Sequence, residues 1–262
     1  MPGGSFHSID GMSRKRKTLG QHFLNSTRFA ARIADIAEAS NEVVIEIGAG
    51  KGILTKQLAR KARRVVAVEI DARLADLLKG MQLPNVDVIN RDFLQVGLHN
   101  LGNPLVVGNI PYNITSAIIR KLIQDRRYVK RAVLTVQREY GAKMMAPLGS
   151  PAYGYLSICL NHYFNVSRKL IIPARYFSPR PRVSSAVVVL EPEKNGINRD
   201  DETELFEFIA GVFRYRRKSL RNAIMHCLGH LPDGIPEDML RKRPQHLSFG
   251  DYQGIYAVIS GT

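Results

Sequence analysis

Cysteine is scarce in this chain, and long apolar runs are absent from it. Cys159 and Cys227 are the only cysteines in 262 residues, and they form no CxxC pair. We therefore expect neither a disulfide framework nor a cysteine metal site, and a reducing compartment, the cytoplasm, fits best. No apolar run reaches the roughly 18–20 residues of a membrane-spanning helix, and the N-terminus holds no apolar segment typical of a secretory signal.

Acidic residues are also in short supply. The chain has 38 Lys and Arg against 23 Asp and Glu, a net charge of +15. Charge says nothing about fold, but an excess this large favours a polyanionic partner, and nucleic acid before a membrane. The basic run from Arg14 to Lys17 has two interpretations, a phosphate-contacting arm or a targeting signal.

Several motifs of catalysis and cofactor binding are missing. His226 and His230 have the spacing of helical zinc ligands, but no second pair accompanies them, so we expect no metal site. There is no G-x-S-x-G motif and no Cys/His nucleophile pair. The stretch EIGAGKG (46–52) departs from the G-x-G-x-x-G dinucleotide pattern at Ile53, and its Gly-Lys pair lacks the Ser or Thr of a P-loop. An NAD-dependent dehydrogenase is therefore disfavoured.

Strand-like and helix-like segments alternate over the first half of the chain. Such alternation predicts an α/β fold with a mostly parallel sheet covered on both faces. Two later strand-like runs would complete a sheet of seven strands. The strand-like runs are EVVIEI (42–47), RVVAVE (64–69), VDVI (86–89), PLVVGN (104–109), RAVLTVQ (131–137), NVSRKLIIP (165–173) and VSSAVVVLEP (183–192).

The polar segment EPEKNGINRD (191–200) marks a boundary between two domains. Beyond it the chain has helical patterns, and we expect helices over 201–215, 217–229, 236–243 and 249–260. The predicted organisation is a disordered extension over residues 1–13, an α/β domain over 14–192 and a small helical domain over 193–262.

Polar or glycine positions follow several of the expected strands. Gly48 and Gly50 lie in a strand-to-helix turn, where glycine lets a ligand approach the main chain and the helix offers unpaired N–H groups. Glu69 ends the next strand and can accept from ribose hydroxyls, Asp92 can accept from an adenine amine, and Asn109 ends the fourth strand. Ligands of open α/β sheets bind at the carboxyl ends of the strands. The set indicates a cofactor that contains a nucleoside.

With the motif NIPY (109–112), this order of residues resembles the S-adenosylmethionine-dependent methyltransferases with a Rossmann-like fold. Three further stretches resemble the small-subunit ribosomal RNA adenine N6,N6-dimethyltransferases, and the resemblance runs from about residue 14 to the C-terminus. These stretches are KTLGQHFL (17–24), FSPRPRVSSAV (177–187) and FRYRRKSLRN (213–222).

The resemblance implies which residues bind S-adenosylmethionine. His22 and Leu24 would line its methionine side, and Gly48, in the turn with Gly50, would lie against it. Glu69 would contact the ribose, Asp92 the adenine, and Asn109 the reactive end. The family commonly has Asn where this chain has His22, so the chain departs from the family pattern at this contact.

The resemblance also implies methylation of an adenine amine at NIPY. The amine lone pair is delocalised into the ring, so the amine needs acceptors for its two N–H bonds before the nitrogen can attack. The side-chain oxygen of Asn109 would be one acceptor, and a backbone carbonyl at Ile110 or Pro111 the other, with Pro111 fixing the turn. Tyr112 would stack on the base, and Phe177 would cover its opposite face.

Basic residues near the expected helical domain form a candidate RNA-binding surface. Arg214, Arg217, Lys218 and Arg221 would lie on one helical face and contact the RNA backbone. The resemblance implies a monomer that dimethylates two adjacent adenosines in a hairpin of small-subunit rRNA during ribosome biogenesis. Two alternatives are a large-subunit methylase of the macrolide-resistance type and a non-catalytic factor for ribosome assembly or transcription on the same fold.

Overall fold

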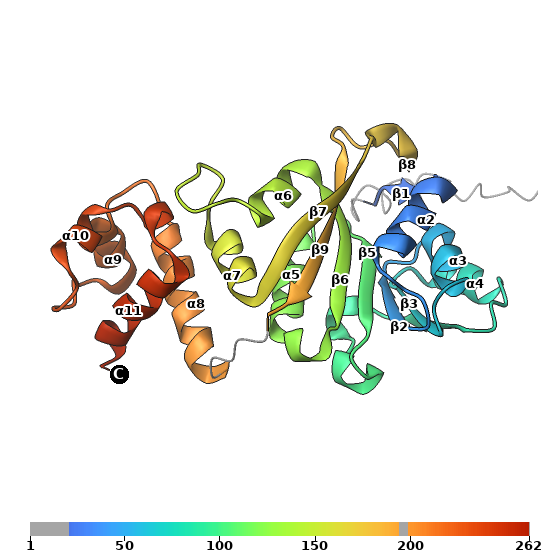
Figure 1. The fold of residues 1–262 in the computed structure, drawn as a ribbon, viewed down its shortest axis with the longest axis horizontal. Helices are drawn as coiled ribbons and strands as arrows, with labels where there is room; N and C mark the ends of the chain where they lie inside the picture. Colours follow the sequence, from blue (N-terminus) through green and yellow to red (C-terminus); the bar gives the residue numbers. More distant parts are fainter. Residues whose placement is uncertain (1–20, 194–198, 262) are drawn as a thin grey trace, which may run out of the picture. The chain divides into compact units, whose positions relative to one another are not determined.

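A computed structural model of the chain describes residues 21–193 and 199–261, shown in Figure 1. The expected extension over residues 1–13 and the basic run from Arg14 to Lys17 lie outside these ranges. Both interpretations of that run therefore stay predictions.

Seven strands form one sheet in the order β4-β3-β2-β5-β6-β9-β7. The four pairings that join β4, β3, β2, β5 and β6 are parallel, which confirms the predicted α/β class. The strand order reverses between β2 and β5, because the chain builds outward to β4 and then returns to the other side of β2. The strands are β2 (Val43–Ile47), β3 (Arg64–Glu69), β4 (Val86–Asn90), β5 (Leu105–Asn109), β6 (Arg131–Gln137), β7 (Phe164–Ile172) and β9 (Ser185–Pro192).

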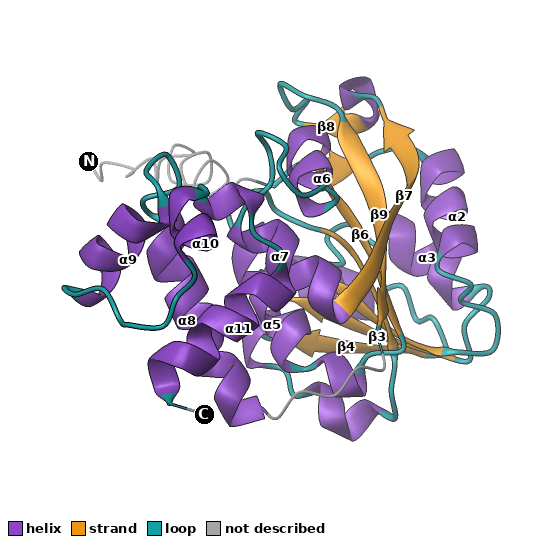
Figure 2. Ribbon diagram, turned by 60° about the vertical axis from the view of Figure 1, so that its left-hand side comes forward, coloured by secondary structure: helices purple, strands orange, loops and turns teal. Residues whose placement is uncertain are grey.

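Helices cover both faces of the sheet, with α2 and α3 on one side and α5 on the other (Figure 2). Runs of Val and Ile suit strands buried on both faces, and every residue of β3 after its first is buried. Side-chain caps begin two of these helices: Ser26 accepts from the Phe29 N–H, and Asp71 accepts from the Arg73 N–H. The helices are α2 (Thr27–Ile36), α3 (Ile53–Ala59), α4 (Ala72–Lys79) and α5 (Thr115–Gln124).

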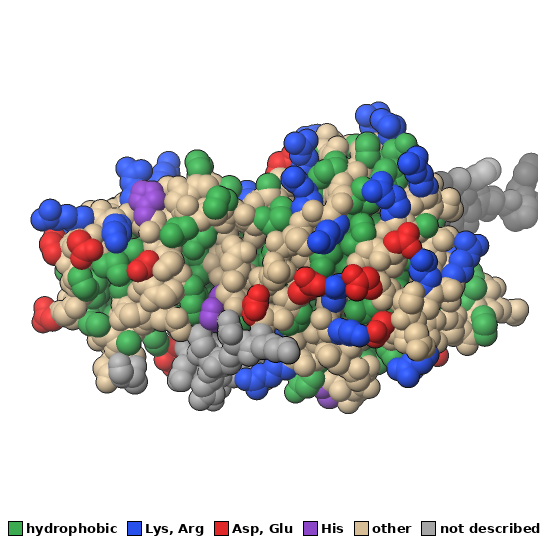
Figure 3. All heavy atoms as spheres, viewed as in Figure 1, with side chains coloured by type: hydrophobic (Ala, Val, Ile, Leu, Met, Phe, Trp, Pro, Cys, Tyr) green, Lys and Arg blue, Asp and Glu red, His purple; other side chains and the backbone are tan. Residues whose placement is uncertain are grey.

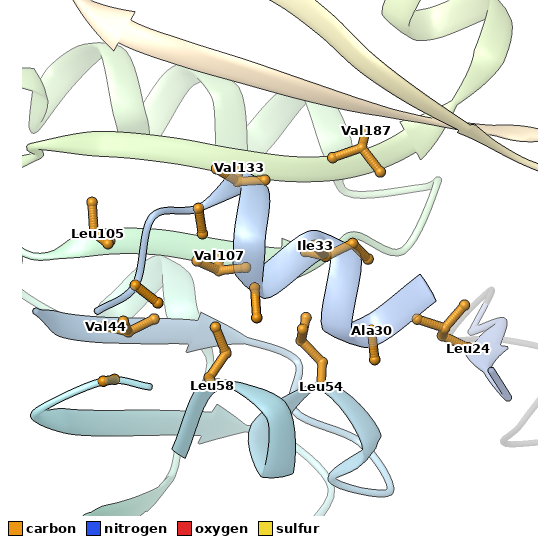
Figure 4. Close-up of a cluster of buried hydrophobic side chains, with 14 of the residues drawn as sticks. Leu24, Ala30, Ile33, Val44, Leu54, Leu58, Leu105, Val107, Val133 and Val187 are labelled. Atoms are coloured by element: carbon orange, nitrogen blue, oxygen red, sulfur yellow. The ribbon is translucent and has the colours of Figure 1, made fainter. Parts of the chain in front are cut away.

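Apolar side chains from the sheet, α2 and α3 form one buried cluster (Figure 4). Val44 on β2 and Val107 on β5 are fully buried against Leu58 of α3 and Ile33 of α2. This cluster fixes α3 on the sheet, and with it the glycine turn from which α3 begins.

A two-residue strand, β1 (Phe23–Leu24), pairs antiparallel with β8 (Phe177–Ser178). Leu24 lies opposite Phe177, and the Asn25 N–H donates to the Tyr176 carbonyl at 2.9 Å. Segments far apart in sequence are thereby joined, which places the residue before β1 beside the loop after β8.

The chain divides into two compact units. The first holds the described residues up to Arg138 together with Arg168–Val189, and the second holds Glu139–Ser167 with the described residues from Leu190 onward. Residues 139–167 group with the C-terminal helices because Tyr153 and Ile158 are buried in the same apolar cluster as Ile209 and Tyr252. The predicted domain boundary near residue 192 follows chain order rather than packing, and stays a prediction.

The second unit is helical, as predicted for its C-terminal part. The Tyr252 hydroxyl donates to the Pro244 carbonyl at 2.8 Å, and burial raises the pKa of this phenol. No described helix of the chain is long and apolar enough to cross a membrane. The helices are α6 (Arg138–Met144), α7 (Tyr155–Tyr163), α8 (Arg199–Phe213), α9 (Leu220–Leu228), α10 (Glu237–Arg241) and α11 (Phe249–Ser260).

One predicted feature of this unit is wrong. Arg214, Arg217 and Lys218 lie in the turn between α8 and α9, and only Arg221 is helical, so the four do not share a helical face. Helix α9 begins anew because the Ser219 side chain caps it and accepts from the Asn222 N–H. We call residues 214–218 the basic turn.

Candidate active site

Three polar side chains share one face of the sheet near its carboxyl edge. The register pairs Glu46 of β2 with Ala67 of β3 and with Val107 of β5. Glu69 and Asn109 lie two residues farther along these neighbouring strands, so they point to the same face as Glu46. The strand order reverses here, and such a switch point is where α/β sheets form their ligand crevice.

The glycine turn follows β2 directly and presents open main chain. Gly48 has φ of +64°, and a Cβ built there would meet nothing within 4 Å. The two carboxylate oxygens of Glu69 accept from the Gly50 N–H at 2.8 Å and the Asp71 N–H at 2.9 Å. The Glu69 side chain is 1% exposed, and its two hydrogen bonds hold the turn in place. Its contact with a ribose stays a prediction.

Asn109 is held in one orientation by the segment that precedes β1. Its Nδ2 donates to the backbone carbonyl of His22 at 2.7 Å. A carbonyl can only accept, so the amide nitrogen must face His22, and Oδ1 remains the acceptor available to a ligand. The His22 ring donates from Nδ1 to the Pro179 carbonyl at 2.7 Å and lies 5.2 Å from the Tyr112 ring.

The NIPY turn offers a second acceptor. The Pro111 carbonyl already accepts from the Ile114 N–H at 3.1 Å, whereas no described residue donates to the Ile110 carbonyl. Of the two backbone candidates, the structure thus favours Ile110. The Tyr112 hydroxyl shares a hydrogen bond of 3.0 Å with Ser185, which holds the hydroxyl end of the ring.

Two adjoining pockets gather most of the predicted site residues. The first, the Tyr112 pocket, contains the NIPY turn and the segment before β1. The second, the Glu46 pocket, lies under the glycine turn, and the two share Phe23, Gly48 and Asn109. The Tyr112 pocket is lined by Gln21, His22, Phe23, Gly48, Asn109, Ile110, Pro111 and Tyr112. The Glu46 pocket is lined by Phe23, Leu24, Glu46, Gly48, Ala49, Gly50, Lys51, Ile53, Leu54 and Asn109.

Phe177 does not line either pocket. Its side chain is 3% exposed and packs in the apolar cluster with Leu24, because β8 is paired with β1. A role as the second face of a base sandwich stays a prediction, and would require the ring to leave this cluster. In the structure, the His22 ring lies beside that of Tyr112.

Asp92 also lies outside both pockets. One of its oxygens accepts from the Leu94 N–H at 2.9 Å, and its adenine contact stays a prediction. The large apolar side chains of Ile70 and Leu94 are 52% and 36% exposed, next in sequence to Glu69 and near Asp92. Exposed apolar groups beside acidic acceptors suit the flat rings of a nucleoside.

Glu46 is a site residue that the motif reasoning missed. It is 1% exposed and lines the Glu46 pocket, and its Oε2 has no hydrogen-bond partner among the described residues. Burial, followed in importance by the negative charge of Glu69, raises its pKa to about 8, although nearby Thr55 opposes the shift. The signal was present in the sequence, since an acidic residue interrupts the apolar strand VVIEI.

These residues fit S-adenosylmethionine. The open main chain at Gly48 accommodates an extended ligand chain, and Glu46 Oε2, which lacks a hydrogen-bond partner among the described residues, is a buried acceptor in the same pocket. The acceptors of Glu69 and Asp92 have the chemistry that ribose and adenine require. In the described part of the chain, no three His, Cys, Asp or Glu side chains gather as metal ligands.

Comparison with known proteins finds similarity to enzymes that methylate ribosomal RNA. A family model described as ribosomal RNA adenine dimethylase matches residues 12–234. The chain is 39% identical over 235 residues to a ribosomal RNA small subunit methyltransferase A of Bacillus cereus (strain B4264), covering 85% of this chain and 79% of that protein.

Two solved structures are similar over almost the whole chain. A dimethyladenosine transferase from Plasmodium falciparum has a TM-score of 0.77 at 25% identity, covering 92% of this chain and 98% of that one. The 23S rRNA methyltransferase ErmE has a TM-score of 0.65 at 26% identity, covering 91% of this chain and 99% of that one.

Proposed function

The chain belongs to the ribosomal RNA adenine dimethylase family, and on that premise we propose that it dimethylates two adjacent adenosines of small-subunit rRNA. It is an S-adenosylmethionine-dependent adenine methylase that transfers methyl groups to N6 amines. The target is a hairpin loop near the 3′ end of that rRNA, modified during ribosome biogenesis in the cytoplasm by a monomeric enzyme.

The observation that carries this proposal is the orientation of Asn109. Its amide nitrogen is occupied by the His22 carbonyl, so Oδ1 and the Ile110 carbonyl form a pair of acceptors in the Tyr112 pocket. An exocyclic amine has two N–H bonds to donate. Accepting both draws the nitrogen out of conjugation and aims its lone pair, so catalysis is mainly positioning.

The cofactor supplies an activated methyl group on a good leaving group. Asn109 and the Ile110 carbonyl would hold the amine nitrogen toward that methyl group, with the base positioned by Tyr112. The alkylated nitrogen is then acidic and loses a proton to solvent, while Asn109 Oδ1 accepts a hydrogen bond from it. Tyr112 holds the ring of the base during both transfers.

Basic side chains of each unit would bind the RNA backbone. On the face drawn in Figure 3, Lys and Arg side chains gather over the part of the first unit where β7 and β8 lie. Arg175, Arg180 and Arg182, which flank Phe177 in sequence, are exposed. A target base in structured RNA must also be unstacked, at a cost of a few kcal/mol that backbone contacts offset.

The basic turn of the second unit adds another cluster. Arg214, Arg217 and Lys218 are exposed, and the Lys218 ammonium donates to His226 Nε2 at 2.6 Å. Arg221 is instead paired with Glu237, so its charge is partly neutralised. We therefore place phosphate binding on the turn rather than on α9.

Tyr112→Phe should retain most activity, whereas Tyr112→Ala should lose roughly 5- to 150-fold, the equivalent of about 1–3 kcal/mol of base stacking. Phenylalanine keeps the ring and removes the hydrogen bond to Ser185. Single-turnover methylation rates measure the effect, and Ser185→Ala is the matched control for that bond. Equal losses in both Tyr112 variants would assign the role to the hydroxyl instead.

Charge reversal of the basic turn should flatten the salt dependence of RNA binding. For Arg217→Glu with Lys218→Glu, the slope of log affinity against log salt should fall by roughly 0.7–0.9 for each RNA phosphate that the variant no longer neutralises. Filter binding between low and moderate salt measures this slope. The control pair, Lys56→Glu with Lys79→Glu on α3 and α4, should leave it unchanged. An unchanged slope in the basic-turn variant would place the RNA elsewhere.

The large-subunit alternative rests on the similarity to ErmE. The higher identity to a small-subunit enzyme argues against it. The deciding experiment incubates the protein and labelled S-adenosylmethionine with under-methylated small subunits and, separately, with large subunits, and then maps the modified bases. Dimethylated adjacent adenosines in the small subunit support the proposal. Label confined to the large subunit, or no label in either, would overturn it.

A further inference from the structure

The Arg175 side chain is held over an aromatic ring. Its guanidinium carbon lies 5.0 Å from the centroid of the Tyr176 ring, in the short helix η4 (Ala174–Tyr176) that leads into β8. The Tyr176 ring in turn packs against Phe29 of α2, with centroids 4.7 Å apart and an angle of 59° between the rings. Arg175 is exposed, whereas Tyr176 and Phe29 are partly buried. A cation thus covers two rings that α2 supports, and we call these three side chains the arginine stack.

The arginine stack lies along the joint between β1 and β8, which leads to the Tyr112 pocket. Pro179 follows β8 and accepts from the His22 ring, which lines that pocket. Tyr176 precedes β8 at the other end of the joint, where its carbonyl accepts from the Asn25 N–H. Figure 1 shows β8 beside β1 and α2. Three residue steps of largely extended chain, about 10 Å, separate Tyr176 from Pro179, and all of these residues belong to the first unit.

No acidic group neutralises Arg175 in the described structure. It forms no ion pair with a described residue and donates no hydrogen bond to one. The sequence explains this, because residues 140–190 contain no Asp or Glu, and neither do residues 11–34. Both segments of the joint fall within these ranges, and Arg28, next in sequence to the Phe29 of the stack, is exposed as well. The uncompensated positive charge favours an anionic partner.

An arginine in this position has the chemistry to bind a nucleobase. The guanidinium is planar, and RNA-binding proteins stack unpaired bases on arginine planes as well as on aromatic rings. The Tyr176 ring covers one face of the Arg175 guanidinium, so the other face can receive a base, and the N–H groups at its edge can donate to a phosphate. Because the two rings already hold the side chain, little conformational entropy is lost when a base stacks on it.

We propose that the arginine stack is a second base-binding site, which holds the unpaired RNA base next to the adenine in the Tyr112 pocket. That pocket offers one pair of acceptors and one stacking ring, so it takes one adenine at a time and the adjoining nucleotide stays outside it. The joint between β1 and β8 then guides this nucleotide to Arg175. The inference rests on the proposed function, because it assigns Arg175 to the RNA substrate of that reaction. Arg175 positions the RNA and touches no reacting atom.

Exchange of arginine for lysine separates stacking from charge. The probe is a synthetic RNA hairpin whose loop holds two adjacent adenosines, and fluorescence anisotropy at several salt concentrations measures its affinity for the full chain. For Arg175→Lys we expect the affinity to fall at least about fivefold, since lysine keeps the charge but not the plane. The slope of log affinity against log salt should not change, because the number of neutralised phosphates is the same. Arg63→Lys, at an exposed position just before β3, is the matched control and should bind as the wild type does.

Removal of the partner base tests the same contact from the RNA side. The hairpin is made again with one loop adenosine and an abasic nucleotide on its 5′ side or, separately, on its 3′ side. At one of these positions the missing base should weaken binding by the wild type at least about fivefold, and binding by Arg175→Lys hardly at all. Tyr176→Leu removes the ring beneath the guanidinium and should be equally insensitive to the missing base, although it retains Arg175. Thermal unfolding checks that Tyr176→Leu folds, and Arg175→Lys, at an exposed position, carries the test if it does not.

Two outcomes would overturn the inference alone. One is an affinity of Arg175→Lys equal to that of the wild type, which would make the arginine stack a structural contact of its loop. The other is an equal loss from the abasic nucleotide in the wild type and in Arg175→Lys, which would mean that no base stacks on Arg175. Failure of the wild type to bind the hairpin would overturn the inference too, and failure to methylate under-methylated small subunits would in addition overturn the proposed function.

Discussion

Asn109→Ala should reduce methyl transfer by at least about 100-fold, comparable to the loss of one oxyanion-hole donor, while cofactor affinity stays largely intact. The reason is geometric. Asn109 Oδ1 is one of two acceptors in the Tyr112 pocket, and its orientation is enforced by the bond from Nδ2 to the His22 carbonyl. Without it, one N–H bond of the amine is unsatisfied and the nitrogen lone pair stays delocalised.

Asn109→Asp keeps an acceptor oxygen at this position but removes the N–H donor that orients the side chain. A carboxylate has acceptors enough for the amine, but one oxygen would face the His22 carbonyl, with which it cannot hydrogen-bond. We expect this variant to be impaired as well, and less stable than the alanine variant. Single-turnover rates and calorimetric cofactor affinity are the measurements. Asn113→Ala, at an exposed position of the same turn, is the matched control. Turnover near that of wild type in Asn109→Ala would refute the assigned role.

The parts of the fold that follow from local patterns were predictable. Apolar strands separated by amphipathic helices required a parallel sheet, and the caps at Ser26 and Asp71 mark helix starts in sequence as in structure. The gathering of Gly48, Asn109 and Tyr112 was also predictable, because parallel strands present their carboxyl ends at one edge.

Other features depend on pairings that no local pattern encodes. Strands β1 and β8 are two residues each, too short to leave a periodic signal, yet their pairing buries Phe177 and brings His22 to Pro179. An aromatic residue in a Pro-rich loop gives no sign of whether it packs inward or faces a ligand. The helical patterns over 201–215 and 217–229 placed the break between the two helices at a single residue, whereas α8 ends at Phe213 and α9 begins only after the cap at Ser219, so most of the basic residues lie in the turn.

Glu46 illustrates a different limit. The sequence shows an acidic residue in an apolar strand, but its meaning depends on what surrounds it in three dimensions. An ion pair with Lys51 would have made it structural, and the position of the Lys51 ammonium over the Phe23 ring removes that explanation. The role of Glu46 therefore depends on how both side chains lie in the folded chain.

Glu46→Gln should stabilise the cofactor-free protein, by about 3 kcal/mol at pH 7. The folded-state pKa of Glu46 is raised from 4.5 to about 8, so the folded chain binds the proton more tightly than the unfolded chain. The stability contribution of this group is then fully present below pH 4.5 and is lost as pH rises to about 8. Over that window the wild type loses about 1.4 kcal/mol for each pH unit, relative to a side chain that does not titrate.

Denaturant unfolding of the cofactor-free proteins at pH 5, 6, 7 and 8 measures the difference. The margin of Glu46→Gln over wild type should widen with each step and level off above pH 8. Glu69→Gln is the informative control in the same crevice, because an amide in place of its carboxylate cannot accept from both the Gly50 and Asp71 N–H groups. That variant should lose stability. A margin for Glu46→Gln that stays constant across this pH range would show that the carboxyl titrates normally. A widening margin would show that the ionised form of this carboxyl, buried in the Glu46 pocket, opposes folding.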